Sequence, residues 1–201
     1  RKLNASAVCA LAIGTSAAND FTRWGVDKNK IHFLPYSISA LPIPANLNES
    51  AMKLRAKYRI LFLFLGQLSH LKGIDLLIRA FSKLSDEFND VGLMLVGYDN
   101  SNGAYQRMAL ATDCADNIHF HGVVDSHQVS DFICASDVVV LPSRYDGWGM
   151  VTNEAASLSR AIIASSAVGA THHVVVDDVN GYVVEPNVDA LYGAMKTYAY
   201  D

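Results

Sequence analysis

The chain has 201 residues, 51% of them hydrophobic, and a formal net charge of −4, which supports one sizeable domain, or a domain with an appendage, rather than two full α/β domains. Residues 1–100 carry 12 Lys and Arg against 8 acids, whereas residues 101–201 carry 4 against 12. Because nucleic-acid binding needs clustered cations, this distribution argues against a polynucleotide partner.

The first part of the chain predicts only short elements. It opens with RKLNAS, which has neither an initiator Met nor the apolar run of a signal peptide, so we expect the chain to begin inside a longer protein. An apolar stretch over residues 8–13 precedes a predicted short helix, Asn19 to Trp24, and a predicted strand, Ile31 to Leu34. Residues 36–50 are proline-rich and weakly periodic, which predicts a linker or crossing loop.

From Arg59 onward, apolar runs alternate with helical patterns. The expected strands are ILFLFLG, GLMLVG, NIHFHG, VVVLPS, AIIAS and GYVVEP, and the expected helices cover 73–84, 105–114, 128–135, a segment starting near 149 and a last segment from 189. Strands that are apolar on both faces and alternate with helices predict a doubly wound, Rossmann-like parallel sheet. Its ligand is expected at the carboxyl ends of the strands, where the strand order reverses. The chain has no GxGxxG, which argues against a dinucleotide site of the usual kind.

Residues 141–158, LPSRYDGWGMVTNEAASL, carry the main candidate site. Gly147 and Gly149 allow backbone N–H groups to approach a ligand, and the first turn of the following helix offers further donors to an anion. Asp146 before the glycines and Glu154 in the helix can each accept from hydroxyl groups. Two such acids around an anion-binding helix start indicate a nucleotide sugar.

A second candidate segment is FLGQLSHLKG, residues 64–73, which leaves the first strand of the alternating pattern. Lys72 stands at the start of the next helix, where a cation opposes the helix dipole at a cost of roughly 0.3 to 1 kcal/mol. A bound phosphate would offset that cost. This position therefore predicts an anion beside Lys72.

These segments resemble the donor-binding domain of glycosyltransferase family 4, retaining nucleotide-sugar enzymes of GT-B architecture. The resemblance covers roughly residues 60–190 and rests on several motifs in order: GxLxxxKG (Gly66, Leu68, Lys72, Gly73), LVG (95–97), HFHG, PSRYDGWGMVTNEA, AVGA and NGYVVEP. The family signature E-x7-E corresponds to Asp146 and Glu154. Departures are Gln67, where the family commonly has an arginine, the shorter acid Asp146, and His173, where a glutamate is frequent.

The resemblance implies a role for each matching position. Lys72 would contact the donor diphosphate and stabilise the leaving group, and Glu154 would hold the ribose hydroxyls. Asp146, with the backbone of residues 147–151 after it, would hold the sugar and the phosphate. Lys72 and Asp146 are therefore the expected catalytic residues. The expected donor-binding residues are Gly66, Gln67, Gly147, Trp148, Gly149, Met150, Val151 and Glu154, and no metal ligand or cofactor is expected.

The resemblance also implies a domain plan and an activity. Residues 1–38 would be the tail end of the acceptor-side N-terminal domain and crossover, 39–58 a linker, and 59–201 the donor domain. The implied reaction moves a sugar from a UDP-sugar or GDP-sugar, with retention, to a hydroxyl of a saccharide or lipid-linked acceptor in polysaccharide or glycolipid assembly. Because most of the N-terminal domain is lacking, we expect little or no transfer by this chain alone. The alternatives are a non-catalytic nucleotide-sugar-binding module and a GT-B-type nucleotide-sugar epimerase.

Plainer interpretations of single residues remain open. Asp146 could be a turn residue and Glu154 a helix-favouring acid. His119 and His121 have no third potential metal ligand nearby in the sequence, which favours residues at the core edge or in the crevice over metal ligands. The run KLRAKYR, residues 53–59, indicates either a solvated face, which we favour, or peripheral contact with anionic lipid. Three scattered cysteines and no apolar run of spanning length predict a cytoplasmic protein, with the inner face of the plasma membrane as a further option.

Overall fold

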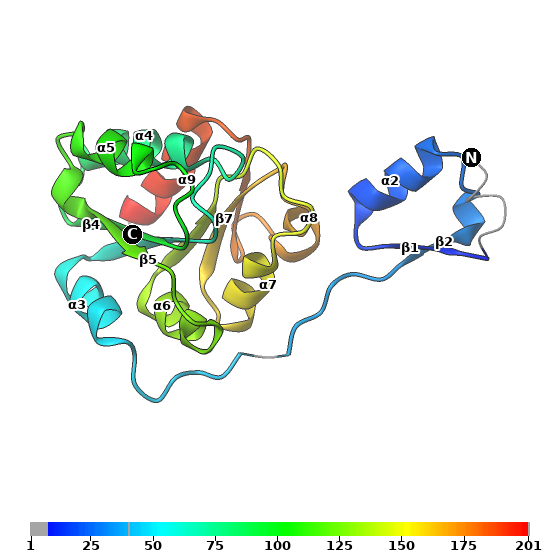
Figure 1. The fold of residues 1–201 in the computed structure, drawn as a ribbon, viewed down its shortest axis with the longest axis horizontal. Helices are drawn as coiled ribbons and strands as arrows, with labels where there is room; N and C mark the ends of the chain where they lie inside the picture. The colour runs from blue at the N-terminus through cyan, green and yellow to red at the C-terminus, as the bar shows by residue number, and fades with distance from the viewer. Residues whose placement is uncertain (1–7, 40, 201) are drawn as a thin grey trace. The chain divides into compact units, whose positions relative to one another are not determined.

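A computed structural model describes residues 8–39 and 41–200, which belong to two compact units, residues 1–39 and 40–201. The described part of the first unit is a strand, a helix, a 3-10 turn and a second strand that pairs in parallel with the first (Figure 1). These elements are β1 (Ala10–Ala12), α2 (Thr15–Arg23), η1 (Lys28–Lys30) and β2 (Ile31–Phe33). Helix α2 starts four residues before the expected Asn19, because Ala17 and Ala18 favour helix although they lack an apolar period.

The second unit is built on a six-stranded parallel sheet with the strand order β5-β4-β3-β6-β7-β8. Its strands are β3 (Ile60–Leu65), β4 (Val91–Val96), β5 (Ile118–Gly122), β6 (Val138–Leu141), β7 (Ala161–Ser165) and β8 (Gly181–Val184). Each of the six strands expected from the alternating pattern is present. The prediction of a Rossmann-like parallel sheet is confirmed.

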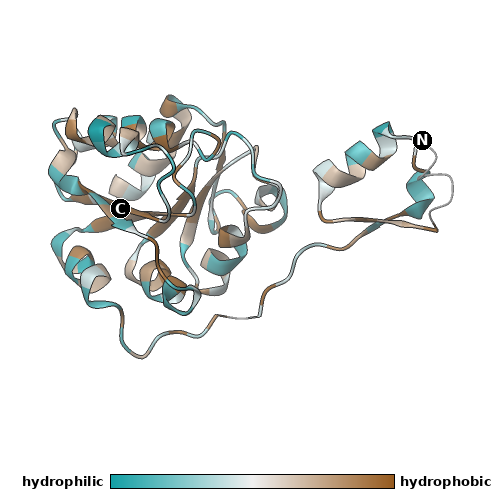
Figure 2. Cartoon of the chain, viewed as in Figure 1, coloured by the Kyte–Doolittle hydropathy of each residue, from teal (hydrophilic) through white to brown (hydrophobic). Residues whose placement is uncertain are grey.

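Helices cover both faces of this sheet (Figure 1). They are α3 (Glu49–Lys57), α4 (Ile74–Ser85), α5 (Ala104–Leu110), α6 (Val129–Ala135), α7 (Met150–Ser157), α8 (Thr171–Val174) and α9 (Val188–Tyr200), with 3-10 turns η2 (Ala115–Asn117) and η3 (Ser126–Gln128). Phe62 and Phe64 of β3 pack with α4 and α9, whereas Leu61 and Leu63 pack with α3 and α6. Because both sets are buried, β3 is apolar at every position, and brown, hydrophobic residues predominate in the central strands of Figure 2.

Helix α3 lies inside residues 39–58, which the sequence predicted as a linker. Asn48 caps it by accepting from the Ser50 N–H at 3.0 Å, and Ala51 is completely buried where α3 packs on α6. The prolines just before α3 indicated a linker, and the apolar side of α3 is too narrow to predict a helix from the sequence. The expected helix over 105–114 ends at Leu110 instead, since Thr112 turns back to donate to the Ala109 carbonyl at 2.7 Å.

The strand order reverses between β3 and β6, because the chain proceeds from β3 to β4 and β5 on one side and from β6 to β7 and β8 on the other. The segments that leave the carboxyl ends of these two strands are residues 66–73 and 142–149. In a doubly wound sheet this edge is where a ligand crevice forms. Both candidate segments of the sequence therefore lie at the same point of the fold. None of the helices in the described residues 8–39 and 41–200 combines the length and apolarity needed to cross a bilayer.

Candidate functional site

The two segments at the strand-order reversal are in direct backbone contact. Gly73 ends the first segment with a left-handed φ of 72°, and a Cβ added there would lie 2.1 Å from the carbonyl oxygen of Pro142. The Arg144 N–H donates to the Leu71 carbonyl at 2.8 Å. Only a glycine permits this close approach. The segments after β3 and β6 thus form one continuous surface.

Lys72 and Asp146, the two expected catalytic residues, meet on that surface. The Lys72 Nζ lies 2.5 Å from Asp146 Oδ2, although the residues are 74 positions apart. Their side chains are 27% and 18% exposed. The ion pair is thus partly exposed to solvent, and the carboxylate of Asp146 balances the charge of Lys72.

Arg144 and Asp75 form a second ion pair next to the first. The two guanidinium nitrogens donate to the two Asp75 carboxylate oxygens, each at 2.7 Å, and one of them also donates to the His70 carbonyl at 2.7 Å. Burial alone would raise the pKa of Asp75, but the hydrogen bonds and charge of Arg144 outweigh it and lower the pKa. Neither Arg144 nor Asp75 is among the site residues expected from the sequence. The available signal was an arginine directly after the Pro-Ser that ends an apolar strand.

The turn that carries Asp146 forms backbone hydrogen bonds with the segment after β7. The Asp146 N–H donates to the Ala167 carbonyl at 3.1 Å, and the Gly169 N–H donates to the Asp146 carbonyl at 3.0 Å. A Cβ at Gly169 would lie 2.3 Å from the Gly147 carbonyl oxygen, so the AVGA motif also serves close packing. In front, Asp146 Oδ1 accepts from the Trp148 N–H at 3.3 Å. Backbone contacts therefore fix the direction of the carboxylate.

Helix α7 begins immediately after this turn. Gly149 precedes it with a left-handed φ of 82°, and a Cβ there would lie 2.5 Å from Val168 Cγ1. Met150 and Val151 form the first turn, whose N–H groups have no acceptor within the helix. Thr152 Oγ1 is buried without a hydrogen-bond partner among residues 8–39 and 41–200. The start of α7 is therefore rich in donors, and the helix dipole adds positive potential there.

Glu154 lies one turn further along α7. Its side chain is half-buried, and burial raises the pKa of its carboxyl group. Within the described part of the chain the carboxylate has no hydrogen-bond or ion-pair partner. Desolvating a carboxylate without pairing it costs free energy. Such a cost is typical of a group that is kept for a ligand.

Three other expected donor-binding residues, Trp148, Gln67 and Gly66, lie in different surroundings. The Trp148 side chain is only 5% exposed, donates from Nε1 to Asn153 Oδ1 at 2.9 Å, and stacks on His173 with ring centroids 5.7 Å apart. The indole of this expected donor-binding residue therefore packs inward. Gln67 is exposed. The backbone of Gly66 lies so close to Gly97 that a Cβ added at Gly97 would sit 1.8 Å from the Gly66 carbonyl oxygen.

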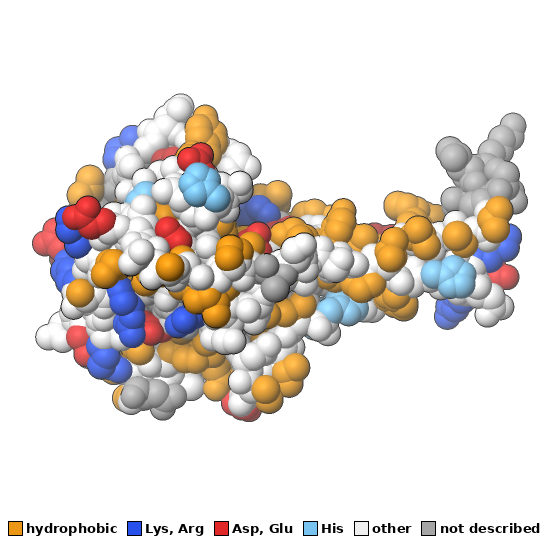
Figure 3. Space-filling view, turned by 90° about the horizontal axis from the view of Figure 1, so that it is seen from below, with side chains coloured by type: hydrophobic (Ala, Val, Ile, Leu, Met, Phe, Trp, Pro, Cys, Tyr) orange, Lys and Arg blue, Asp and Glu red, His pale blue; other side chains and the backbone are white. Residues whose placement is uncertain are grey.

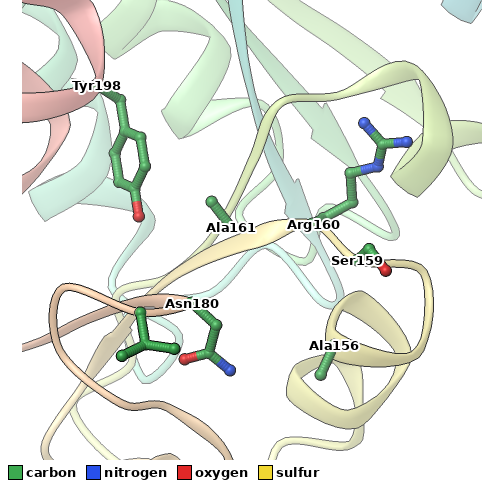
Figure 4. Close-up of a pocket in the computed structure, with 7 residues that line it drawn as sticks. Ala156, Ser159, Arg160, Ala161, Asn180 and Tyr198 are labelled. Atoms are coloured by element: carbon green, nitrogen blue, oxygen red, sulfur yellow. The ribbon is translucent and has the colours of Figure 1, made fainter. Parts of the chain in front are cut away.

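Cavities lie at both ends of the sheet in the described part of the chain. One, of about 300 Å³, lies at the carboxyl ends of β3, β4 and β5 and is lined in part by Tyr98, Phe120 and Gly122. The other, of about 460 Å³, lies at the amino ends of β7 and β8, where Ala161 and Asn180 line it (Figure 4). The carboxyl end of α7 borders this second cavity, and its dipole disfavours anions. The first cavity is also lined by Leu68 and so adjoins the segment that carries Lys72.

The remaining sequence candidates have structural partners. His119 Nε2 lies 2.7 Å from the Tyr58 hydroxyl, and His121 Nε2 lies 2.8 Å from the Ser50 hydroxyl. Burial, and secondarily the charge of Lys57, lowers the pKa of His119. Among the residues that the structure describes, no three or more His, Cys, Asp or Glu side chains are grouped so as to hold a metal ion.

The basic run over residues 53–59 is largely paired. Its ion pairs are Lys53 with Glu49 at 2.7 Å, Arg55 with Asp137 at 3.0 Å and Arg59 with Asp90 at 2.7 Å. Figure 3 likewise shows Lys and Arg side chains interspersed with acidic ones. These pairs favour the solvated-face interpretation of the run, because a lipid-binding face needs unpaired cations.

Comparison with known proteins identifies related sequences. A family model described as "Glycosyl transferases group 1" matches residues 48–199. The D-inositol 3-phosphate glycosyltransferase of Xylanimonas cellulosilytica is 32% identical over 180 residues, covering 84% of this chain and 42% of that protein. The alpha-D-kanosaminyltransferase of Streptomyces kanamyceticus is 25% identical over 161 residues, covering 78% of this chain and 42% of that protein. The chain thus spans less than half the length of these relatives.

Solved structures share the fold over nearly the whole chain. Anabaena Alr3699/HepE, in complex with UDP and glucose, superimposes with a TM-score of 0.81 at 20% identity, covering 98% of this chain and 55% of that one. WaaG, described as a glycosyltransferase involved in lipopolysaccharide biosynthesis, gives a TM-score of 0.76 at 19% identity, covering 95% of this chain and 53% of that one. At these identities the likeness shows a common fold.

Proposed function

The chain belongs to the group 1 glycosyltransferases, and on that premise we propose that it binds the nucleotide-sugar donor of an enzyme that transfers a sugar to an acceptor hydroxyl. The observation that carries the proposal is the Lys72–Asp146 ion pair, which lies at the strand-order reversal. The start of α7, with its backbone N–H donors, lies beside this pair. A cation, a helix start and an acid at the same point of the fold match a diphosphate joined to a sugar.

We propose the following placement of the donor. The diphosphate lies between Lys72 and the first turn of α7, the sugar hydroxyls face Asp146, and the ribose hydroxyls face the unpaired carboxylate of Glu154. The base occupies the cavity of about 300 Å³ at the ends of β3, β4 and β5. The complexes of the Anabaena protein with UDP and with UDP-glucose support a nucleotide-sugar ligand for this fold.

In the proposed reaction, the bond between the sugar carbon and the diphosphate oxygen breaks, the acceptor oxygen forms the new bond to that carbon, and the acceptor's hydroxyl proton passes to the departing diphosphate. Lys72 and the dipole of α7 stabilise the negative charge that develops on the leaving diphosphate. Asp146, whose backbone is held on both sides, fixes the sugar relative to that leaving group. We further propose retention at the sugar carbon and membership of family 4. Since the chain spans 42% of its relative from Xylanimonas, acceptor binding and transfer are assigned to the longer protein.

Calorimetric titration of the 201-residue chain with UDP, GDP and ADP tests the proposal. We expect one nucleotide to bind, which would also identify the base. If none binds at millimolar concentration to folded protein, the donor site is wrong. A chain that binds nucleotide, and whose longer form releases the nucleoside diphosphate only when an acceptor is present, is a transferase component rather than an epimerase or a binding module.

Replacing Glu154 by Gln should weaken nucleotide binding by about tenfold, since a neutral amide accepts more weakly from ribose hydroxyls. The same change should raise the melting temperature at pH 7. Burial raises the pKa of Glu154 in the folded state, so ionising it costs stability above its unfolded pKa and costs nothing well below that value. The gain should therefore vanish near pH 3. Glu49→Gln, at a side chain that is 84% exposed, is the control and should change neither quantity.

Replacing Gly147 by Ala should weaken nucleotide binding several-fold while leaving thermal stability nearly unchanged. Gly147 is outside the left-handed region, and a Cβ there would meet no protein atom within 4 Å. The added methyl group would occupy open space that we assign to the donor. Calorimetry and a melting curve on the same sample measure both effects. Unchanged affinity would show that this space lies outside the donor site.

A further inference from the structure

We propose that Arg144 is a positioning residue that sets Lys72 in place for the donor diphosphate, through its contacts with the turn before Lys72 and with Asp75 after it. The inference rests on the proposed function, because it concerns the same site. It adds a residue that acts on the ligand through another side chain.

Arg144 reaches both sides of Lys72 along the chain. Its backbone N–H donates to the Leu71 carbonyl at 2.8 Å, and its guanidinium donates to the His70 carbonyl at 2.7 Å. On the other side, the guanidinium binds both carboxylate oxygens of Asp75 in the first turn of α4. One residue of the segment after β6 therefore fixes the chain before and after Lys72.

The turn that carries Lys72 is held mainly by polar and backbone contacts. Leu68 before it and Ile74 after it are buried, but none of residues 69–72 is, and Leu71 is 52% exposed. Within the turn, the Lys72 N–H donates to the Ser69 carbonyl at 3.1 Å. A surface turn without apolar anchors opens at low free-energy cost. The contacts of Arg144 therefore restrict the positions available to the Lys72 side chain.

The charge of Arg144 is already satisfied. A bidentate pair with a carboxylate is directional and strong, and the Asp75 side chain is only 15% exposed. Hydrogen bonding to Asp75 raises the pKa of Arg144 above its ordinary value. To bind a phosphate itself, the guanidinium would have to give up two hydrogen bonds to Asp75 and one to the His70 carbonyl, whereas the Lys72 ammonium would give up its single contact with Asp146. The geometry thus favours an action through Lys72 over direct contact with the ligand.

A double-mutant cycle on the 201-residue chain separates these two modes of action. UDP and GDP are titrated in parallel into the unmodified chain, Arg144→Met, Lys72→Ala and the double variant. We expect Arg144→Met to reduce affinity at least tenfold when Lys72 is present and less than twofold when Lys72 is replaced. An equal loss in both backgrounds would mean that Arg144 contacts the ligand itself, and would overturn the proposal. Loss with Lys72→Ala but none with Arg144→Met would also overturn it, while leaving the proposed function intact.

A second measurement needs no nucleotide. The rate at which an amine-acylating reagent modifies Lys72 is followed by mass spectrometry, relative to Lys53, whose side chain is 73% exposed. We expect Arg144→Met and Asp75→Asn each to raise the relative rate several-fold in protein that remains folded by circular dichroism, and Arg144→Lys to give an intermediate rate. Unchanged rates in the folded variants would overturn the proposal. Absence of nucleotide binding alongside raised rates would instead count against the proposed function alone.

Discussion

Replacing Lys72 by Ala is expected to weaken binding of UDP or GDP by between about tenfold and about a hundredfold, which corresponds to the loss of one charge-assisted hydrogen bond. The loss should exceed that of the contact alone, because the variant leaves the carboxylate of Asp146, 18% exposed, without its cation beside the diphosphate. Like charges then repel. Calorimetric titration of the variant against the unmodified chain measures the effect.

Two control variants separate the causes. Lys83→Ala removes a lysine that pairs with Asp189 at 2.6 Å on α9 and should leave affinity unchanged. Asp146→Asn in the Lys72→Ala background removes the repulsion and should restore part of the affinity for the free nucleoside diphosphate. If Lys72→Ala binds as tightly as the unmodified chain, Lys72 is a surface lysine paired with an acid, and the diphosphate has been placed wrongly.

The sheet was predictable because its signal is local. Phe62, Leu63 and Phe64 lie consecutively in a strand that is buried on both faces, and such a strand must be apolar at every position. Helix α3 was missed because its stability comes from a cap at Asn48 and from burial of Ala51 on α6. Packing of a nine-residue helix such as α3 against a helix distant in the sequence produces no clear apolar pattern within those nine residues.

The difference between local sequence patterns and contacts between distant segments also decides which site residues could be predicted. Asp146, Gly149 and Glu154 lie within one short segment, so their spacing is visible in the sequence. The pair between Arg144 and Asp75 joins residues 69 positions apart, and neither residue has a local pattern that identifies its partner. Only the juxtaposition of β3 and β6 in the sheet brings them together. Contacts that hold a site in place are therefore harder to predict than the groups that face the ligand.

Replacing Gly73 by Ala should reduce the free energy of unfolding by roughly 3 kcal/mol or more, as expected for backbone strain combined with a steric clash. Gly73 has φ 72° and ψ 25°, and the new Cβ would lie 2.1 Å from the Pro142 oxygen. The neighbour is backbone and cannot rotate away, so the segments after β3 and β6 must separate. Nucleotide binding should be lost with stability, because Lys72 is the preceding residue.

Gly103 provides a matched control for the clash. It too precedes a helix, with φ 77° and ψ 15°, but its Cβ would meet only the ends of two flexible side chains, the nearer being Arg107 Nη1 at 3.3 Å. Gly103→Ala therefore isolates the left-handed strain, roughly 1 to 2 kcal/mol. Urea unfolding followed by Trp148 fluorescence, in a Trp24→Phe background, reports on residues 40–201 alone. Equal losses at the two glycines would mean that the segments after β3 and β6 yield easily, and a crevice built on their contact could not hold Lys72 and Asp146 in a fixed geometry.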